Sequence, residues 1–259
     1  MTARALRRAV LLTFDNLGEA ADLERDVTPP APVGDHPSVT VALPAVLELL
    51  RALELPATFF VEGINAGLYP DAVRAIAAAG HEVGLHAWRH ERWSELEAGE
   101  QDALLQRSID AFGRLGIEVD GFRPPGGELG PGTLPALAAH GVRWCSPVGT
   151  GARCADGLAI VPFRWALVDA YHRMESFADL RRQLGDAPAP LSARATADAL
   201  LEGLAAAEEG PTVLIMHPFL MVGEEERAEA ERVLRWVAEQ VAAGERWVAT
   251  GRELAASVA

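Results

Sequence analysis

Three short, largely apolar runs in the sequence each end at a residue that can bind a metal ion or transfer a proton. The runs and the residues that follow them are AVLLTF (9–14) before Asp15, EVGL (82–85) before His86, and PTVLIM (211–216) before His217. Apolar runs of this length, bounded by turn-forming residues, are typical of buried β-strands. Because α/β barrels carry their chemistry at the carboxyl ends of parallel strands, the pattern predicts such a barrel with one site at that end.

Predicted helices alternate with predicted strands along the chain. Helices are expected at 41–53, 71–79, 101–115, 196–208 and 224–243, and further strands at 57–61, 142–145 and 247–249, with a short edge-like segment at 160–162. This alternation is typical of an α/β fold. A chain of 259 residues that is 49% hydrophobic can bury one large core, so we expect a single catalytic domain, residues 1–259, with a distorted (β/α) barrel fold.

A pair of histidines follows the second of these strands. His86 and His90 are four residues apart, which is one turn of a helix, so their imidazoles can turn toward one metal ion. Taken alone, this spacing is as often an accident of a protein surface. The other strand-end residues decide between the two interpretations, and they favour a metal site.

A turn-rich segment in the middle of the chain contributes an arginine. Residues 121–127 read GFRPPGG, which places Arg123 between an apolar residue and a rigid turn. On its own, Arg123 is better explained by a surface ion pair, and Asp169 by a helix N-cap. The order of the segments along the chain reverses this judgement.

Five segments in this order resemble the motifs of the polysaccharide deacetylase superfamily, also called the NodB homology or carbohydrate esterase family 4 fold. They are TFDN (13–16), HAWRH (86–90), RPPGG (123–127), a divergent WALVD (165–169) and IMH (215–217). Within the superfamily, residues 81–93 are most similar to cytoplasmic-side deformylases of lipid-linked aminoarabinose. Residues 162–171 and 217–227 look like a subgroup that includes metal-free allantoinases and peptidoglycan-deacetylase-like proteins. The resemblance implies a distorted (β/α) barrel of the NodB type.

The resemblance also implies a role for each residue of the site. His86, His90 and Asn16 would hold a divalent metal, with zinc expected, which polarises the acyl oxygen and lowers the pKa of water. Catalytic roles would fall to Asp15 as general base, Arg123 pairing with Asp15 and keeping it ionised, His217 as general acid, Asp169 orienting His217, and the backbone N–H of Gly126 in the oxyanion hole. The family usually has an aromatic side chain where this chain has Gly126, so a wider pocket is expected.

Asn16 is the main departure from the family pattern. The family has a second acid there, and an amide brings no compensating charge to the cation. Three interpretations stay open: a site of two histidines and an asparagine, a site that uses another loop ligand such as Glu19, or a metal-free relative.

These residues predict a metal-dependent hydrolase of a non-peptide C–N bond, removing acetyl or formyl from an amino sugar or similar small amide. The alternatives are a metal-free, allantoinase-like hydrolase of cyclic amides and a catalytically silent carbohydrate-binding relative. Retention of the base, the acid and their charged partners favours an enzyme. Trp88, Trp165 and Tyr171 could line its cleft.

Charge and cysteine content narrow the partners and the compartment. With 23 basic and 37 acidic residues, the net charge of −14 disfavours nucleic acid and anionic membrane surfaces as partners. The sequence contains no run of about 18 apolar residues, so stable membrane insertion is not expected. The apolar run after Arg8 leads straight into the first motif without a cleavage site, and Cys145 and Cys154 suit a reducing environment, so a cytoplasmic location is expected. Whether the chain forms a homo-oligomer is left open.

Overall fold

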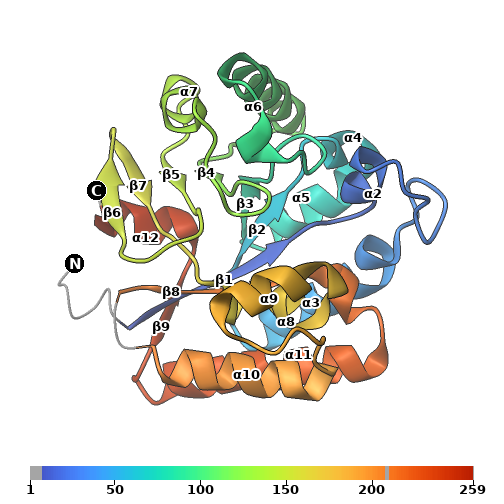
Figure 1. Ribbon diagram of the computed structural model, residues 1–259, viewed down its shortest axis with the longest axis vertical. Helices are drawn as coiled ribbons and strands as arrows, with labels where there is room; N and C mark the ends of the chain where they lie inside the picture. Colours follow the sequence, from blue (N-terminus) through green and yellow to red (C-terminus); the bar gives the residue numbers. More distant parts are fainter. Residues whose placement is uncertain (1–7, 208–209, 259) are drawn as a thin grey trace.

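The computed structural model describes residues 8–207 and 210–258. Among these residues, one curled sheet runs through the centre of the molecule in the order β6-β7-β5-β4-β3-β2-β1-β8, and β9 pairs with β1 (Figure 1). The strands are β1 (Ala9–Asp15), β2 (Thr58–Val61), β3 (Glu82–Leu85), β4 (Gly121–Phe122), β5 (Trp144–Cys145), β6 (Arg153–Ala155), β7 (Leu158–Ile160), β8 (Thr212–Met216) and β9 (Trp247–Ala249). Apart from the antiparallel β6–β7 pair, these pairings are parallel.

The strand β1 lies near the middle of this sheet and is buried along its whole length. On one side its carboxyl half pairs with β2 and its first residues with β9, while β8 runs along its other side. A parallel strand that is covered on both faces has a continuous apolar sequence, and this accounts for the apolar run of β1.

The sheet curls until its two ends approach each other. After β7 the chain continues to Val168, which forms a parallel bridge with Ile215 of β8. This segment therefore narrows the gap between the β6–β7 end of the sheet and its β8 end. Successive side chains point to opposite faces. Leu11 and Phe60 therefore belong to the core cluster inside the curl, whereas Phe14 and Phe59 belong to the cluster under the helices. The expected α/β class and distorted barrel are confirmed.

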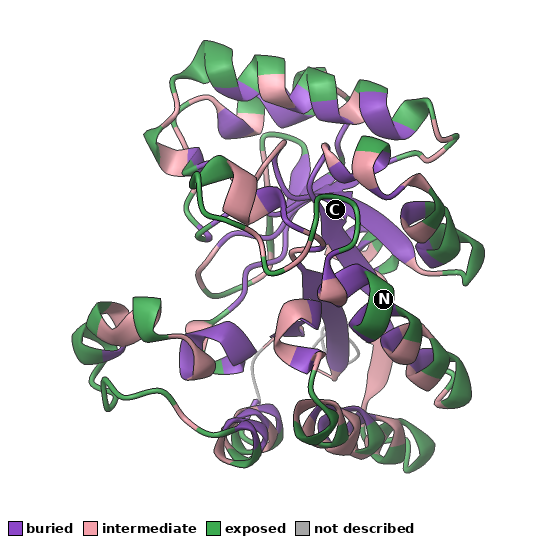
Figure 2. Cartoon of the chain, turned by 90° about the vertical axis from the view of Figure 1, so that its right-hand side faces the viewer, coloured by how far each residue is buried: buried purple, intermediate pink, exposed green. Residues whose placement is uncertain are grey.

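Helices cover the outside of the sheet. They are α2 (Ala20–Glu24), η1 (Ser38–Ala42), α3 (Leu43–Ala52), α4 (Asn65–Leu68), α5 (Pro70–Ala78), η2 (Trp93–Glu95), α6 (Ala98–Gly113), α7 (Thr133–Ala139), η3 (Trp165–Leu167), α8 (Asp169–Arg173), η4 (Glu175–Phe177), α9 (Ala178–Leu184), α10 (Ala193–Ala205), η5 (Pro218–Met221), α11 (Glu224–Ala242) and α12 (Gly251–Val258). Figure 2 shows their inward faces buried and their outward faces exposed, as amphipathic helices require. None of the described helices combines the length and the apolar composition needed to cross a membrane.

Several boundaries differ from the expectations. The segment 17–39 follows the first strand and is rich in proline, which favours a long loop, but it contains α2 and the start of η1. The expected strand 142–145 is reduced to β5, and 160–162 is not an edge, because β6 pairs outside β7. The helix expected at 196–208 begins earlier, as α10, and Glu208 lies outside the described residues. One domain over residues 1–259 stays a prediction.

Candidate active site

The side chains singled out from the sequence gather at the carboxyl edge of the sheet. Asp15 ends β1, while His86, Arg123 and His217 follow β3, β4 and β8 directly. Because parallel strands deliver their carboxyl ends to one edge, residues 108 positions apart, such as Arg123 and Asp15, come into contact. This edge is the candidate active site.

Asp15 and Arg123 form a buried ion pair. Arg123 Nη1 donates to Asp15 Oδ1 at 2.7 Å, and the side chains of Arg123 and Asp15 are 1% and 4% exposed. Arg123 also donates to Thr13 Oγ1 at 2.7 Å and to Ser146 Oγ at 2.9 Å, and its guanidinium lies 4.2 Å from the centre of the Phe60 ring. The surface ion pair considered for Arg123 is therefore wrong, because the guanidinium is fully enclosed.

The pKa of Asp15 differs from the expectation that Arg123 keeps this carboxyl ionised. Burial raises the pKa of Asp15, and the nearby charges of Arg123 and His217 lower it by less, so the pKa lies above its ordinary value. Arg123 thus acts in the expected direction but does not keep the pKa low overall. A carboxylate with a raised pKa is better matched to accepting a proton from water.

Asp169 holds His217 from two sides. His217 Nδ1 donates to Asp169 Oδ1 at 2.5 Å, and the backbone N–H of His217 donates to Asp169 Oδ2 at 2.8 Å. The carboxylate also accepts the N–H of Ala170 at 2.6 Å, at the start of α8. With Nδ1 engaged, Nε2 of His217 is the ring atom left for proton transfer.

The same pair sets the charge of His217. Burial lowers the pKa of His217, but the charge and hydrogen bond of Asp169 and the charge of Asp15 together outweigh it, so the pKa is raised. Asp15 and His217 are thus close enough for each to shift the pKa of the other. The structure thus brings the expected base, Asp15, and the expected acid, His217, close to each other.

His86 and His90 face each other, with ring centres 5.0 Å apart. His86 Nδ1 donates to the backbone carbonyl of Arg123 at 2.8 Å, which leaves the lone pair on Nε2. Burial lowers the pKa of His86 to about 3 and that of His90 well below its ordinary value. Both imidazoles are therefore neutral, which is the form that binds a metal.

The two histidines do not meet by helical spacing, as the sequence suggested. Residues 86–90 form a tight turn in which Ala87 and His90 have φ values of 60° and 73°. Such left-handed backbone is uncommon in residues other than glycine and is found at functional sites. The turn, and not a helix, brings His90 back over the strand end.

Asn16 provides a test of whether this site fits a metal ion. Its backbone is left-handed, with φ of 60°, and its Oδ1 atom is buried without a hydrogen-bond partner among the described residues. Asn16 follows β1 and His86 follows β3, at the same edge of the sheet. An unpaired buried carbonyl oxygen and two neutral imidazoles are donors of the kind that suit a divalent cation. Among the residues described, no three His, Cys, Asp or Glu side chains form such a group, and the Asn16 amide is the candidate for a third ligand beside the two histidines.

The alternative ligand, Glu19, is occupied elsewhere. Its carboxylate accepts the N–H of Gly34 at 2.7 Å and the hydroxyl of Tyr69. The loop that contains it nonetheless reaches the site, because Arg25 Nη2 lies 3.5 Å from His90 Nδ1.

Gly126 lies in a turn closed by a 2.9 Å hydrogen bond from Gly127 N to the Pro124 carbonyl. Its φ of 75° favours glycine, and a Cβ atom built on Gly126 would meet no atom within 4 Å. The space that an aromatic side chain would fill is therefore open. Its oxyanion-hole role stays a prediction.

The aromatic residues considered for the cleft lie in different surroundings. Tyr171 is buried and donates to Asp186, so it does not line an open cleft. Trp165 packs with Phe163, their ring centres 5.2 Å apart. Trp88 lines an apolar groove of about 300 Å³ beside α4 and α6.

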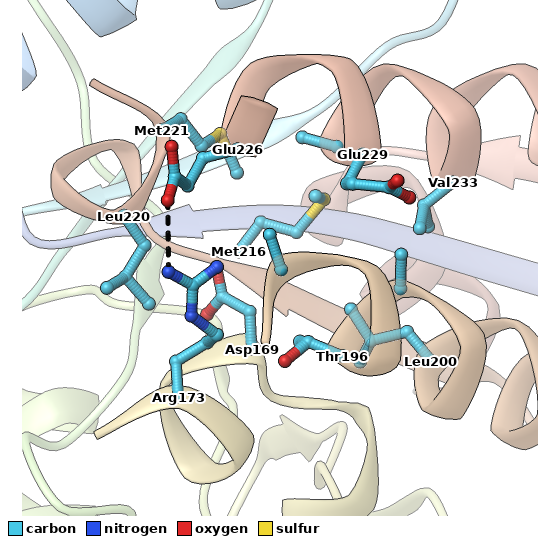
Figure 3. Close-up of a pocket in the computed structure, with 13 residues that line it drawn as sticks. Asp169, Arg173, Thr196, Leu200, Met216, Leu220, Met221, Glu226, Glu229 and Val233 are labelled. Carbon is cyan, nitrogen blue, oxygen red and sulfur yellow. Dashed lines mark hydrogen bonds and ion pairs between the residues drawn. The ribbon is translucent and has the colours of Figure 1, made fainter. Parts of the chain in front are cut away.

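A small pocket of about 30 Å³ lies behind Asp169 (Figure 3). The ion pair of Arg173 Nη2 with Glu226 Oε1, 3.2 Å long, stands beside Asp169 in this view. Thr196, on α10, contributes a buried hydroxyl without a partner among the described residues. This pocket is too small for a substrate and belongs to the support of Asp169.

Sequence reasoning missed three residues of this region. Thr13 and Ser146 hold the guanidinium of Arg123, and Glu62 is a completely buried acid directly after β2. Glu62 follows an apolar strand, as Asp15, His86 and His217 do, so the same pattern could have found it.

Comparison with known proteins agrees with this fold. The family model for polysaccharide deacetylases matches residues 3–145, more than half of the chain. The chain therefore belongs to the polysaccharide deacetylase family.

Individual relatives are more distant. The chain is 30% identical over 105 residues to the peptidoglycan deacetylase of Helicobacter pylori, an alignment that covers 40% of this chain and 36% of that protein. Among solved structures, a candidate polysaccharide deacetylase from Mycobacterium smegmatis superposes with a TM-score of 0.80 at 27% identity, covering 96% of this chain and 89% of that one. A carbohydrate esterase family 4 pseudoenzyme from Bacillus anthracis superposes with a TM-score of 0.60 at 18% identity, covering 95% and 65%, and shares the fold alone.

Proposed function

We propose that this protein hydrolyses an amide C–N bond and removes an acetyl or formyl group from an amino sugar or a similar small amide. The observation that carries the proposal is the meeting of two buried ion pairs, Asp15 with Arg123 and His217 with Asp169, at one edge of the sheet. A base and an acid held in this way supply the two proton transfers that amide hydrolysis needs.

The reaction follows from the geometry of these pairs. Asp15 takes a proton from a water molecule, whose oxygen attacks the acyl carbon. His217 Nε2 then gives a proton to the amine nitrogen as the C–N bond breaks, leaving a carboxylic acid and a free amine. Asp169 stabilises the charged form of His217 before the transfer, and Arg123 fixes the direction of Asp15.

His86, His90 and Asn16 would hold a divalent cation, with zinc as the first candidate. Bound there, it would polarise the acyl oxygen and make a water molecule more acidic. Nδ1 of His86 donates to the Arg123 carbonyl, so Nε2 is the ring nitrogen that is free to bind the cation. The backbone N–H of Gly126, in an open turn, is the candidate partner for the developing negative charge.

The proposed substrate is small and not strongly anionic, because a protein of net charge −14 repels anionic polymers. Both cysteines are free, which supports a reducing, cytoplasmic location. The narrower likeness to deformylases and allantoinases stays part of the proposal.

The test is a measurement of amine and acid release from a panel of substrates. The panel contains N-acetylglucosamine and its short oligomers, an N-formyl amino sugar and allantoin, each with zinc or cobalt. Release from at least one N-acyl substrate, lost in Asp15→Asn, is expected. If no substrate is cleaved faster by the wild type than by Asp15→Asn, the hydrolase proposal fails and a silent binding protein takes its place.

Asn16 favours one alternative function, a metal-free hydrolase of cyclic amides. The same assay distinguishes it from the metal-dependent deacylase. A site with a neutral third ligand could work without metal, as in the allantoinase-like interpretation. Turnover of allantoin that persists after exhaustive chelation would support that alternative. Turnover of an N-acyl sugar that chelation removes and zinc restores would support the metal-dependent deacylase.

A further inference from the structure

Glu62 is a buried acid that the proposed reaction does not use. Its side chain is completely enclosed. Oε2 accepts the backbone N–H of Leu17 at 3.3 Å and Nδ2 of Asn65 at 3.0 Å, whereas Oε1 has no hydrogen-bond partner among the described residues. Leaving a carboxyl oxygen buried and unpaired is costly, so its retention requires an explanation.

The sheet places Glu62 between the ligands of the proposed metal site. Strand β2 lies between β1, which leads to Asn16, and β3, which leads to His86. Val61 pairs with Leu85, so Glu62 lies level with His86 on the neighbouring strand. Because side chains alternate along a strand, Glu62 takes the face of Phe60, over which the Arg123 guanidinium lies.

Two more unpaired oxygens lie around the same backbone segment. Oδ1 of Asn16 and Oδ1 of Asn65 are both buried without a partner among the described residues. Asn65 Nδ2 donates to the Leu17 carbonyl at 2.9 Å as well as to Glu62, so the three side chains surround residues 16–17. Buried oxygen acceptors without a hydrogen-bond donor favour a cation in their neighbourhood.

The charge count of the site points the same way. Two neutral imidazoles and an amide bring no negative charge to a dication, and the charge of Asp15 is opposed by Arg123. Burial raises the pKa of Glu62 to about 8, and the neighbouring charges that act on it, those of Asp15 and Glu91, are both negative. The carboxyl is therefore mainly protonated near neutral pH without a cation, and a nearby cation would favour its ionised form. Glu62 thus has no cationic partner among these protein groups.

We propose that Glu62 supplies the negative charge of the metal centre that Asn16 does not, from one strand away. The inference rests on the metal site of the proposed function. Glu62 is a positioning residue: it stabilises the cation held by His86, His90 and Asn16. An acid lost at the end of β1 is replaced in its electrostatic effect by an acid at the end of β2.

The test is calorimetric titration of the intact protein with zinc, and separately with cobalt, at one pH and in one buffer. Glu62→Gln keeps the shape of the side chain and an oxygen acceptor but removes the charge. We expect zinc to bind about 10-fold to 100-fold more weakly, as is typical when a group supporting metal ligands is lost. Glu62→Asp keeps the charge and should lose less.

Glu82→Gln is the matched control. Glu82 is also a buried acid, but it begins β3 at the opposite end of the sheet and is held by Thr58 Oγ1 at 3.0 Å, Trp144 Nε1 at 3.0 Å and Arg252 N at 2.8 Å. Its replacement changes buried charge without approaching the metal site, so zinc affinity should stay as in the wild type. Thermal melting of each variant reports whether the fold is retained.

A double variant separates charge from structure. Asn16→Asp with Glu62→Gln moves the negative charge from position 62 to position 16, and it should regain most of the affinity lost in Glu62→Gln. Wild-type affinity in Glu62→Gln, or an equal loss in Glu62→Asp and Glu62→Gln, would overturn the inference. If His86→Ala still abolishes binding in that case, the metal site stands and only the role of Glu62 fails.

Discussion

Arg123 connects the two halves of the site. Its guanidinium holds Asp15, and its backbone carbonyl accepts the Nδ1 proton of His86. The proposed base and one proposed metal ligand are therefore oriented by the same residue. Since removing one partner of a buried ion pair costs about 3–5 kcal/mol, the pair is sensitive to any change at either end.

The roles of the base and the acid lead to a first prediction. Asp15→Asn and His217→Ala should each reduce kcat about 10²-fold to 10⁴-fold on a substrate that the wild type cleaves, because each removes one proton transfer. Steady-state kinetics, with circular dichroism to confirm folding, is the measurement. His140→Ala is the control, because His140 bonds Asp102 away from the site. Near-normal turnover by either site variant would mean that another group transfers that proton.

Asn16 gives the second prediction at this scale. Asn16→Asp should tighten zinc binding, because an anionic oxygen replaces a neutral one whose Oδ1 has no other partner among the described residues. Turnover should not rise in proportion, since a more fully neutralised cation is a weaker Lewis acid. Calorimetry of both proteins in one buffer measures the affinity. An unchanged affinity would show that residue 16 does not face the metal.

At the scale of elements, the orientation of His217, the proposed general acid, depends on how α8 packs against β8. Asp169 begins α8, and the bridge between Val168 and Ile215 places it against the end of β8, where His217 follows. A five-residue helix is marginal on its own, so its position is fixed by this contact. The helix N-cap considered for Asp169 is wrong, because Val168 stands at the N-cap position of α8 and Asp169 is the first residue of the helix.

This contact predicts a pH effect. As the proposed general acid, His217 would act in its charged form, so activity should be present below its pKa and be lost as the pH rises through it. Because Asp169 raises that pKa, the basic limb of kcat/KM should lie above pH 6.5 in the wild type. In Asp169→Asn burial remains while the raising charge is gone, so the limb should move to lower pH. A limb that stays in place would exclude His217 as the titrating acid.

Close packing of β4 against β5 gives a prediction about stability. A Cβ atom added to Gly121 would lie 2.4 Å from Trp144 Cε2 and would overlap the indole ring. Trp144 is fully buried, so its ring has little room to move away. Gly121→Ala should therefore lower the free energy of unfolding by about 1–3 kcal/mol. Gly113→Ala, in α6 with no atom within 4 Å, should raise it by up to about 1 kcal/mol. Urea unfolding of both variants decides, and equal stability of the two would contradict the packing argument.

The elements differ in how far the sequence predicts them. β1 and α11 have long, regular patterns, and the predicted boundaries are right to within a residue or two. β4 and β5 have two residues each, too few for any periodicity to be visible. The turn at 86–90 was taken for helical spacing because sequence separation alone does not reveal a left-handed backbone.

For the whole molecule, the sequence predicts the members of the site better than their relations. The strand-end pattern indicates Asp15, His86 and His217, but their contacts depend on a strand order that brings β8 next to β1. The sequence also does not show that burial outweighs Arg123 in setting the pKa of Asp15, because burial is a property of the folded molecule. Glu62 was missed because no family motif includes it.

The proposed metal ligands come from two segments of the sheet, so metal binding should stabilise the whole fold. About one divalent ion per chain is expected, and an ion that binds only the folded state at a free concentration 100 times its Kd adds about 2.7 kcal/mol to the free energy of unfolding. For a chain of this size, each kcal/mol raises Tm by roughly 2–4 °C, so zinc should raise Tm by roughly 5–10 °C. Calorimetric melting with zinc, then with excess chelator, tests this, and His86→Ala and His90→Ala should both lose the shift. If Tm and elemental analysis show no zinc, cobalt or nickel bound to the wild type, the site works without metal, and His86 and His90 must then act through hydrogen bonds to the substrate.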